Sequence, residues 1–288
     1  MHPYPFAYHR ATSIDEAIQF LDANQEDGKL LAGGHSLLPV MKLRLAQPAV
    51  LIDITGLEEL RGVRLDGGIV EIGALTTHHD LEHDEILAQH LSLLPAIAHV
   101  VGDQQIRFRG TIGGTLAHAD AAGDYPAGVL ALGGEIVLQG PSGTRSIPVD
   151  EFFLGFLTTA LEPNELLTFI RIPALPENAG VSYQKLANTA SGYALVGVAV
   201  VLQKDADGTI ASLRIGITGT SDVAYRPTAV ESALIGTNPD LDALKAACAR
   251  ATEGIDVLGD QHAPTDYRAK VTCNLVRRGI QEALANAR

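Results

Sequence analysis

The sequence has no tryptophan and only two cysteines, Cys248 and Cys273. Two thiols cannot form a disulfide framework, and they are too few to ligate an iron–sulfur cluster, which takes four cysteines. Each is expected to be a small buried hydrophobic residue. These absences exclude a disulfide-stapled fold and an iron–sulfur centre held by this chain alone.

Basic residues are also scarce, because 21 lysines and arginines face 34 acidic residues and give a net charge of −13. Such a chain repels nucleic acid and anionic lipid, so neither is expected as a partner. The longest apolar run, residues 194–202, is too short to span a bilayer, and the first residues lack the pattern of a secretory signal. The sequence predicts a cytoplasmic protein that does not span a membrane.

The 288 residues are 46% hydrophobic, which is enough for a sizeable core, and the length favours two domains. Proline, glycine and asparagine are concentrated in residues 173–180, as is typical of a linker. We place the domain boundary there. The first domain is then residues 1–175 and the second is residues 176–288.

The start of the first domain is predicted to be a small α/β unit of about residues 1–55. A capping-box pattern at Ser13 predicts a helix. Short apolar strands are predicted at 29–32 and 50–54, on either side of a helical turn that follows Ser36.

The rest of the first domain, about residues 56–175, is predicted to be largely antiparallel. Apolar segments flank Asp66-Gly67-Gly68, which is a strong hairpin signal. The other predicted elements are helices at 76–90, 91–101 and 124–132, and strands at 105–109, 135–139, 144–149 and 166–172. In the second domain they are strands at 181–186, 194–203 and 209–216, then helices at 226–235, 241–253 and 266–285. The fold class is therefore α+β.

Two glycine pairs stand out, in Ala32-Gly33-Gly34-His35-Ser36 and in Thr111-Ile112-Gly113-Gly114-Thr115. Each pair is predicted to be a turn whose backbone N–H groups can approach a ligand closely, because no Cβ shields them. Amides with neighbouring hydroxyls and no fixed cation suit a diphosphate, and two such loops suit a dinucleotide. No P-loop motif and no Gly-x-Gly-x-x-Gly after a strand is present, which argues against an ATP or GTP P-loop and a Rossmann site.

With Leu37 to Lys42 after the first pair, these motifs resemble the FAD-binding medium subunits of the molybdenum hydroxylases, the xanthine oxidase family, in particular those of aerobic carbon monoxide dehydrogenases. The resemblance extends over essentially the whole chain. Its further motifs are Ala74-Leu75-Thr76, Asp124-Tyr125-Pro126-Ala127, Pro163-Asn164-Glu165-Leu166-Leu167, Tyr183-Gln184-Lys185-Leu186, and a helix opened by Tyr267-Arg268 that ends with Arg277-Arg278.

The resemblance implies a vanillyl-alcohol-oxidase-type (PCMH-type) FAD-binding domain, followed by a CO dehydrogenase flavoprotein C-terminal domain of antiparallel sheet plus helical bundle. It implies FAD that is held non-covalently, even though His35 lies in the first loop. No catalytic acid, base or nucleophile and no metal ligand is implied. The residues implied to bind FAD are Lys29, Leu31, Ala32, Gly33, Gly34, His35, Ser36, Thr111, Ile112, Gly113, Gly114, Thr115, Asp124, Leu167, Lys185 and Tyr193.

Within that set, Asp124 is implied to accept from ribityl or ribose hydroxyls, and Leu167 and Lys185 to border the cofactor. Tyr193 is implied to lie near the isoalloxazine face. The residues themselves leave structural alternatives open: a helix cap for Asp124, an exposed strand position for Lys185, and a domain-interface aromatic for Tyr193. The sequence departs from the family at Gly192, where members often carry an acidic residue, and this affects the geometry beside Tyr193.

In the family, a large molybdopterin-binding subunit oxidises the substrate, and a small subunit relays electrons through two [2Fe–2S] clusters. The resemblance implies that this chain receives the electrons on FAD and passes them to an external acceptor. The implied assembly is a dimer of heterotrimers, which the acceptor could place at the inner face of the membrane. Two other interpretations stay open: a stand-alone FAD-dependent oxidase of the same fold, which needs its own catalytic base, and a non-catalytic assembly subunit.

A histidine-rich stretch is the last notable feature. It holds His78, His79, His83 and His90 together with Asp80, Glu82 and Asp84. His79 and His83 have the i, i+4 spacing of metal ligands on one helix face. Because the sequence gives no third ligand a defined place, we interpret the stretch as a solvated polar face.

Overall fold

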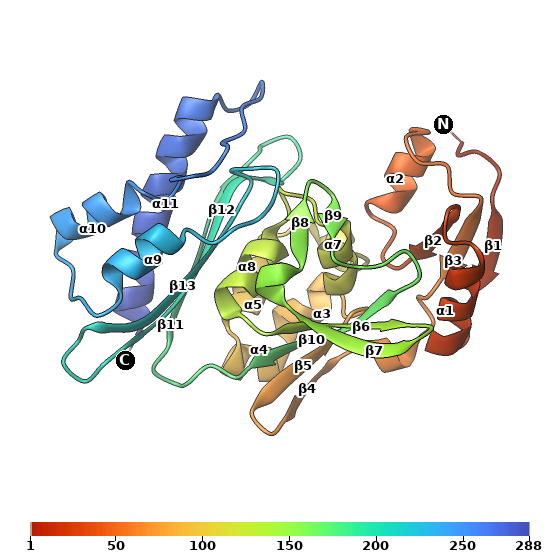
Figure 1. Cartoon of the computed structure of the whole chain (residues 1–288), viewed down its shortest axis with the longest axis horizontal. Coiled ribbons are helices and arrows are strands. Elements are labelled where there is room, and N and C mark those ends of the chain that lie inside the picture. Colours follow the sequence, from red (N-terminus) through yellow and green to blue (C-terminus); the bar gives the residue numbers. More distant parts are fainter. Residues whose placement is uncertain (1, 288) are drawn as a thin grey trace.

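Three successive parts of the chain each build a main sheet in the computed structural model, which describes residues 2–287 (Figure 1). The first part has parallel strands in the order β1-β3-β2 and two helices, α1 and α2. Ser13 caps α1 by accepting from the N–H of Glu16, and α1 buries Ala17, Ile18 and Leu21. The elements are β1 (Ala7–Arg10), α1 (Ile14–Ala23), β2 (Gly28–Leu31), α2 (Leu37–Lys42) and β3 (Val50–Asp53). Strand β1 was not predicted from the sequence, because its four residues are mostly exposed and show no apolar alternation.

The second part is a five-stranded antiparallel sheet in the order β4-β5-β10-β6-β7, covered by six short helices (Figure 1). The strands are β4 (Val63–Asp66), β5 (Ile69–Gly73), β6 (Glu135–Gly140), β7 (Gly143–Pro148) and β10 (Leu166–Pro173). The helices are α3 (His78–His83), α4 (Glu85–His90), α5 (Leu93–His99), α6 (Gln104–Arg107), α7 (Ile112–His118) and α8 (Asp124–Leu132). Short elements η1 (Glu58–Leu60), η2 (Val149–Glu151), β8 (Phe153–Gly155) and β9 (Thr158–Thr159) complete it.

Two sequence-based predictions were wrong in this part. The strand predicted at 105–109 is helix α6, because the carboxylate of Asp103 accepts from the N–H of Ile106 and starts a helical turn. The single helix predicted at 76–90 is two helices, because Asp84 leaves the helical conformation and caps α4 by accepting from Leu87.

The third part is an antiparallel sheet of β11 (Gly180–Ala187), β12 (Ala194–Lys204) and β13 (Ile210–Thr218). Three helices follow: α9 (Thr228–Leu234), α10 (Leu241–Cys248) and α11 (Thr265–Asn286). Helix α11 packs on β11 and β12, and α8 packs on β12 and β13. A Cβ at Gly216 of β13 would lie 1.9 Å from the carbonyl oxygen of Ala127, so the backbones of β13 and α8 touch. All nine residues of α8 are buried.

The α+β fold class predicted from the sequence is confirmed by this arrangement. Helix α10 ends at Cys248, earlier than the predicted 253, whereas α11 has nearly the predicted bounds. Cys248 is buried and Cys273 is half-buried, and both are free thiols. Within residues 2–287, no helix combines the length and apolarity needed to cross a bilayer.

Candidate functional site

The two glycine loops lie against each other. Residues 32–36 connect β2 to α2, and residues 111–115 begin α7. A Cβ at Gly33 would lie 2.2 Å from the carbonyl oxygen of Arg109 and 2.9 Å from Cα of Gly110. A Cβ at Gly114 would lie 3.9 Å from Cβ of Ala32. The fold therefore brings the two motifs, far apart in the sequence, into one continuous surface.

The first loop offers free backbone donors. Among residues 2–287, no acceptor takes the N–H groups of residues 33–37. Gly34 has φ +76°, which turns the chain between β2 and α2. Adjacent N–H groups without internal partners form an anion-binding concavity. This loop therefore fits the diphosphate of a dinucleotide, as its sequence predicts.

The second loop differs from the prediction. Gly113 and Gly114 lie in the first turn of α7, not in an open turn. The N–H of Ile112 donates to the Thr76 carbonyl (3.1 Å), that of Gly113 to the Ala74 carbonyl (2.9 Å) and that of Gly114 to Thr111 Oγ1 (3.2 Å). The expectation of open amides at this pair was wrong, because Thr111 caps the helix at Gly114 and the carbonyl of Ala74 takes the amide of Gly113. The exposed Gly114 still allows a ligand to approach closely, beside the hydroxyl of Thr111.

A cavity of about 190 Å³ lies where the loops meet. Its wall includes Arg61 and Arg109, which the sequence analysis did not select because it assumed loops without a cation. Arg109 directly precedes the second motif, and that position was the available signal. Cationic walls favour bound phosphate. The cavity is smaller than a typical cofactor pocket, so FAD would extend beyond it. Its lining residues are Ala32, Gly33, Thr55, Arg61, Leu75, Thr77, Phe108, Arg109 and Thr111.

Asp124 lies at the first position of α8 but does not cap it. Its carboxylate accepts from the hydroxyl of Tyr183 (2.6 Å) and from Nζ of Lys185 (2.9 Å). Nζ of Lys185 also donates to the carbonyl of Val100 (3.0 Å). Burial raises the pKa of Asp124, and the charge of Lys185 and the bond from Tyr183 oppose this rise. The capping alternative for Asp124 and the exposed-strand alternative for Lys185 are therefore wrong; the three residues join β11 to α8 and to the end of α5.

Tyr193 lies half-exposed in the loop between β11 and β12. Burial raises the pKa of its phenol, as does the charge of Asp120, whereas the hydroxyl of Ser36 lowers it. Tyr193 is thus beside the first glycine loop, which agrees with a position over bound FAD and also with the interface alternative. Gly192 has φ +74°, where a side chain would be strained, so the local backbone accounts for glycine at this position.

The positions of four other residues predicted to bind FAD do not test that prediction. Leu167 is buried in the core around the five-stranded sheet. Lys29 and His35 are exposed, and Leu31 is half-buried beside Gly34. Their contacts neither add to the predicted site nor contradict it.

His78 lies directly behind the loops, and the prediction of a solvated polar face is wrong for this residue, because its side chain is buried. Its backbone N–H donates to the carbonyl of Gly110 (3.0 Å), and a Cβ at Gly110 would lie 2.6 Å from its Nε2. Its ring stacks on Tyr125, with centroids 5.0 Å apart, and its buried Nδ1 has no hydrogen-bond partner among residues 2–287. Burial, and then the charges of His35 and Arg107, lower the pKa of His78 from 6.5 to about 4.

Acid is expected to destabilise the fold through His78. The unfolded chain binds a proton at this residue near pH 6.5, whereas the folded chain resists it until about pH 4. The free energy of unfolding should therefore fall by roughly 3 kcal/mol as the pH is lowered across this window. His78→Phe keeps the stacking and cannot be protonated, so it should lose this part of the pH dependence. Urea unfolding across the window checks this, and an identical pH slope in the two proteins would contradict it.

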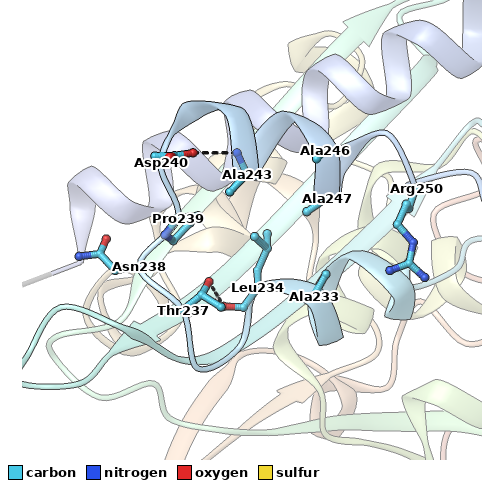
Figure 2. Close-up of a pocket in the computed structure, with 10 residues that line it drawn as sticks. All are labelled: Ala233, Leu234, Thr237, Asn238, Pro239, Asp240, Ala243, Ala246, Ala247 and Arg250. Carbon is cyan, nitrogen blue, oxygen red and sulfur yellow. Dashed lines mark hydrogen bonds between the residues drawn. The ribbon is translucent and has the colours of Figure 1, made fainter.

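A larger cavity, of about 500 Å³, lies between α9 and α10 (Figure 2). Alanine side chains, Leu234 and Pro239 line much of it, and the carboxylate of Asp240 points back to the N–H of Ala243, 2.8 Å away. Arg250 at its edge is paired with Glu253. None of the residues predicted to bind FAD lines it. Thr237, Asp240 and Arg250 already have hydrogen-bond partners, so the glycine loops remain the better candidate site.

Comparison with known proteins confirms the family predicted from the sequence. Residues 4–175 match the family described as the FAD binding domain in molybdopterin dehydrogenase, and residues 181–283 match the CO dehydrogenase flavoprotein C-terminal domain. The chain is 41% identical to the carbon monoxide dehydrogenase medium chain of Hydrogenophaga pseudoflava, over 99% of both chains. It is 37% identical to the nicotine 6-hydroxylase medium subunit of Paenarthrobacter nicotinovorans, over 96% of both.

Two solved structures also contain chains that are similar to this one along its whole length. The carbon monoxide dehydrogenase structure from Hydrogenophaga pseudoflava contains a chain that matches with a TM-score of 0.97 and 42% identity, over 100% of both chains. A chain of quinoline 2-oxidoreductase from Pseudomonas putida 86 matches with a TM-score of 0.94 and 31% identity, over 100% of this chain and 99% of that one.

Proposed function

Because this chain belongs to the family of FAD-binding medium subunits of the molybdenum hydroxylases, we propose that it is the electron-exit subunit of a three-component complex. It is an FAD-binding subunit of a CO dehydrogenase-like or xanthine dehydrogenase-like oxidoreductase. In our proposal, electrons arrive from a small [2Fe–2S] subunit and leave to an external acceptor, and a large molybdopterin subunit chooses the substrate. In this proposal the complex is a cytoplasmic dimer of heterotrimers. We also propose that the boundary between the two domains of this chain lies at residues 173–180.

The run of free N–H groups at residues 33–37 is the observation that carries the FAD site. Bound FAD would supply a two-electron acceptor that can release its electrons again. The residues of this chain do the binding and the positioning. The first loop holds the diphosphate with amides, Arg61 and Arg109 add positive charge at the cavity wall, and Tyr193 covers the loop from the second domain.

An exposed apolar hairpin supports assembly with other subunits. Leu154 and Phe156, at the β8–β9 hairpin, are each 62% exposed, and residues 152–161 carry no charge. Exposed apolar groups of this size mark protein interfaces. A stand-alone oxidase is less well supported, because its substrate would need a free base, whereas Asp124 is already bonded to Tyr183 and Lys185 and His78 is buried.

FAD binding by the purified full-length chain tests the proposal. The chain is expected to bind one FAD, visible as flavin absorbance that stays with the protein on gel filtration. Acid precipitation should then release the flavin into the supernatant, because the cofactor is held without a covalent bond. A colourless chain that stays colourless when FAD is added would overturn the proposal, and flavin that stays in the pellet would overturn non-covalent binding.

A further inference from the structure

Helix α3 gathers three potential metal ligands. His79, Glu82 and His83 each offer a ligand atom, and these atoms lie within 4.8 Å of one another. The sequence pattern predicts a solvated face here, but His79 and Glu82 are half-buried. We propose that these three residues form a binding site for a divalent transition-metal cation such as Zn²⁺. This site is separate from the FAD function and does not depend on it.

The two imidazoles are oriented for such a role. Nδ1 of His83 lies 2.8 Å from the backbone carbonyl of His79. A carbonyl only accepts, so Nδ1 carries the proton and Nε2 keeps a free lone pair for a cation. His79 stacks on Phe108, with ring centroids 4.0 Å apart, and its centroid is 4.5 Å from that of His83. A hydrogen bond from the second ring nitrogen, such as that of His83, fixes the ring of a metal-binding histidine, and the stack on Phe108 packs the ring of His79.

Glu82 supplies the carboxylate and is itself held in place. Its Oε2 pairs with Nε of Arg107 (2.9 Å), and its Oε1 pairs with Nδ1 of His99 (2.8 Å). His99 is largely exposed and adjoins Glu82, so it is placed to turn inward as a fourth ligand. The positive charge of Arg107 opposes a bound cation, and we therefore expect micromolar affinity instead of the tighter binding of a dedicated structural site.

The donor set selects the kind of cation. Two imidazoles with one carboxylate suit zinc and its neighbours among the transition metals and do not suit calcium or magnesium, which prefer oxygen ligands. In a tetrahedral zinc site with bonds of about 2.0–2.1 Å, ligand atoms are roughly 3.4 Å apart. The side chains therefore have to draw together slightly. The exposed ring of His83 can move without disturbing the core.

The site adjoins the FAD cavity but is not part of it. Phe108 stands between them, because it stacks on His79 and also lines the cavity at the glycine loops. None of the three proposed ligands lines that cavity. Cation binding can thus be measured on the chain with or without FAD.

Calorimetric titration of the chelator-treated full-length chain with ZnCl₂ tests the proposal. We expect one Zn²⁺ per chain, and binding at least tenfold weaker in both His83→Gln and His79→Phe, the second of which keeps the stack on Phe108. His262→Ala, which removes an exposed histidine of the second domain, is the matched control and should bind like the parent. Thermal unfolding shows whether each variant is folded. Unchanged binding in both variants, or no saturable binding in the parent, would overturn the site.

Discussion

Replacing Gly33 by alanine is expected to weaken FAD binding at least a hundredfold, which is about 2.7 kcal/mol. The new Cβ would lie 2.2 Å from the carbonyl oxygen of Arg109 and 2.9 Å from Cα of Gly110. Both are backbone atoms, so no side-chain rotation relieves the clash. The two loops have to separate, and their separation disrupts the surface that their contact creates. Titration of the variant with FAD, followed by flavin fluorescence, measures the loss.

Gly155→Ala is the matched control for this experiment. The same methyl group added at Gly155 meets no atom within 4 Å, and Gly155 is not at a positive φ. This variant should bind FAD like the parent. If Gly33→Ala binds FAD within about threefold of the parent, a difference below 1 kcal/mol, the contact between the loops is not what forms the site.

The turn at the first glycine pair was predicted because part of its signal is local. Gly34 needs a positive φ, so its residue type follows directly from the local backbone, whereas the close approach of Gly33 to Arg109 is a long-range contact. The second loop was predicted less well. Gly113 is required by packing, since a Cβ there would lie 2.5 Å from Cβ of Ala74, and the amides of Ile112 and Gly113 are taken by partners distant in the sequence. A motif does not reveal which partners its amides already have.

Local signals also account for the secondary-structure elements that were predicted correctly. The first helix and the hairpin around Gly67 were predicted because caps and turn residues lie within a few positions of the elements that they start. Residues 105–109 were assigned as a strand, although the cap that starts helix α6 is Asp103, two residues before the assigned segment. Arg61 could not have been selected, because it directly follows η1, belongs to no motif and lines the cavity only through the fold.

Removing Lys185 is expected to have the largest effect on stability. Its ammonium group and the carboxylate of Asp124 form a buried ion pair, with side chains 7% and 6% exposed. Breaking a buried pair from one side leaves an unpaired charge and costs about 3–5 kcal/mol. Lys185→Met should lower the free energy of unfolding by that amount, measured by urea denaturation at neutral pH. Lys245→Met is the matched control, since it breaks an exposed pair with Asp242 and should cost below about 1 kcal/mol.

The pH dependence of Lys185→Met separates this ion pair from simple loss of packing. Burial already raises the pKa of Asp124 in the folded chain, and the charge of Lys185 opposes that rise. Without Lys185, the folded-state pKa of Asp124 rises further above its unfolded value, so the folded variant takes up a proton as the pH falls. The proton neutralises the unpaired charge, and the stability deficit relative to the parent should therefore shrink toward acid pH.

A double variant gives a second test of the ion pair. Asp124→Asn combined with Lys185→Met should cost less than the two single changes together, because no buried charge is left alone. A deficit that is the same at every pH, or single effects that add in full, would mean that the two side chains act only by filling space.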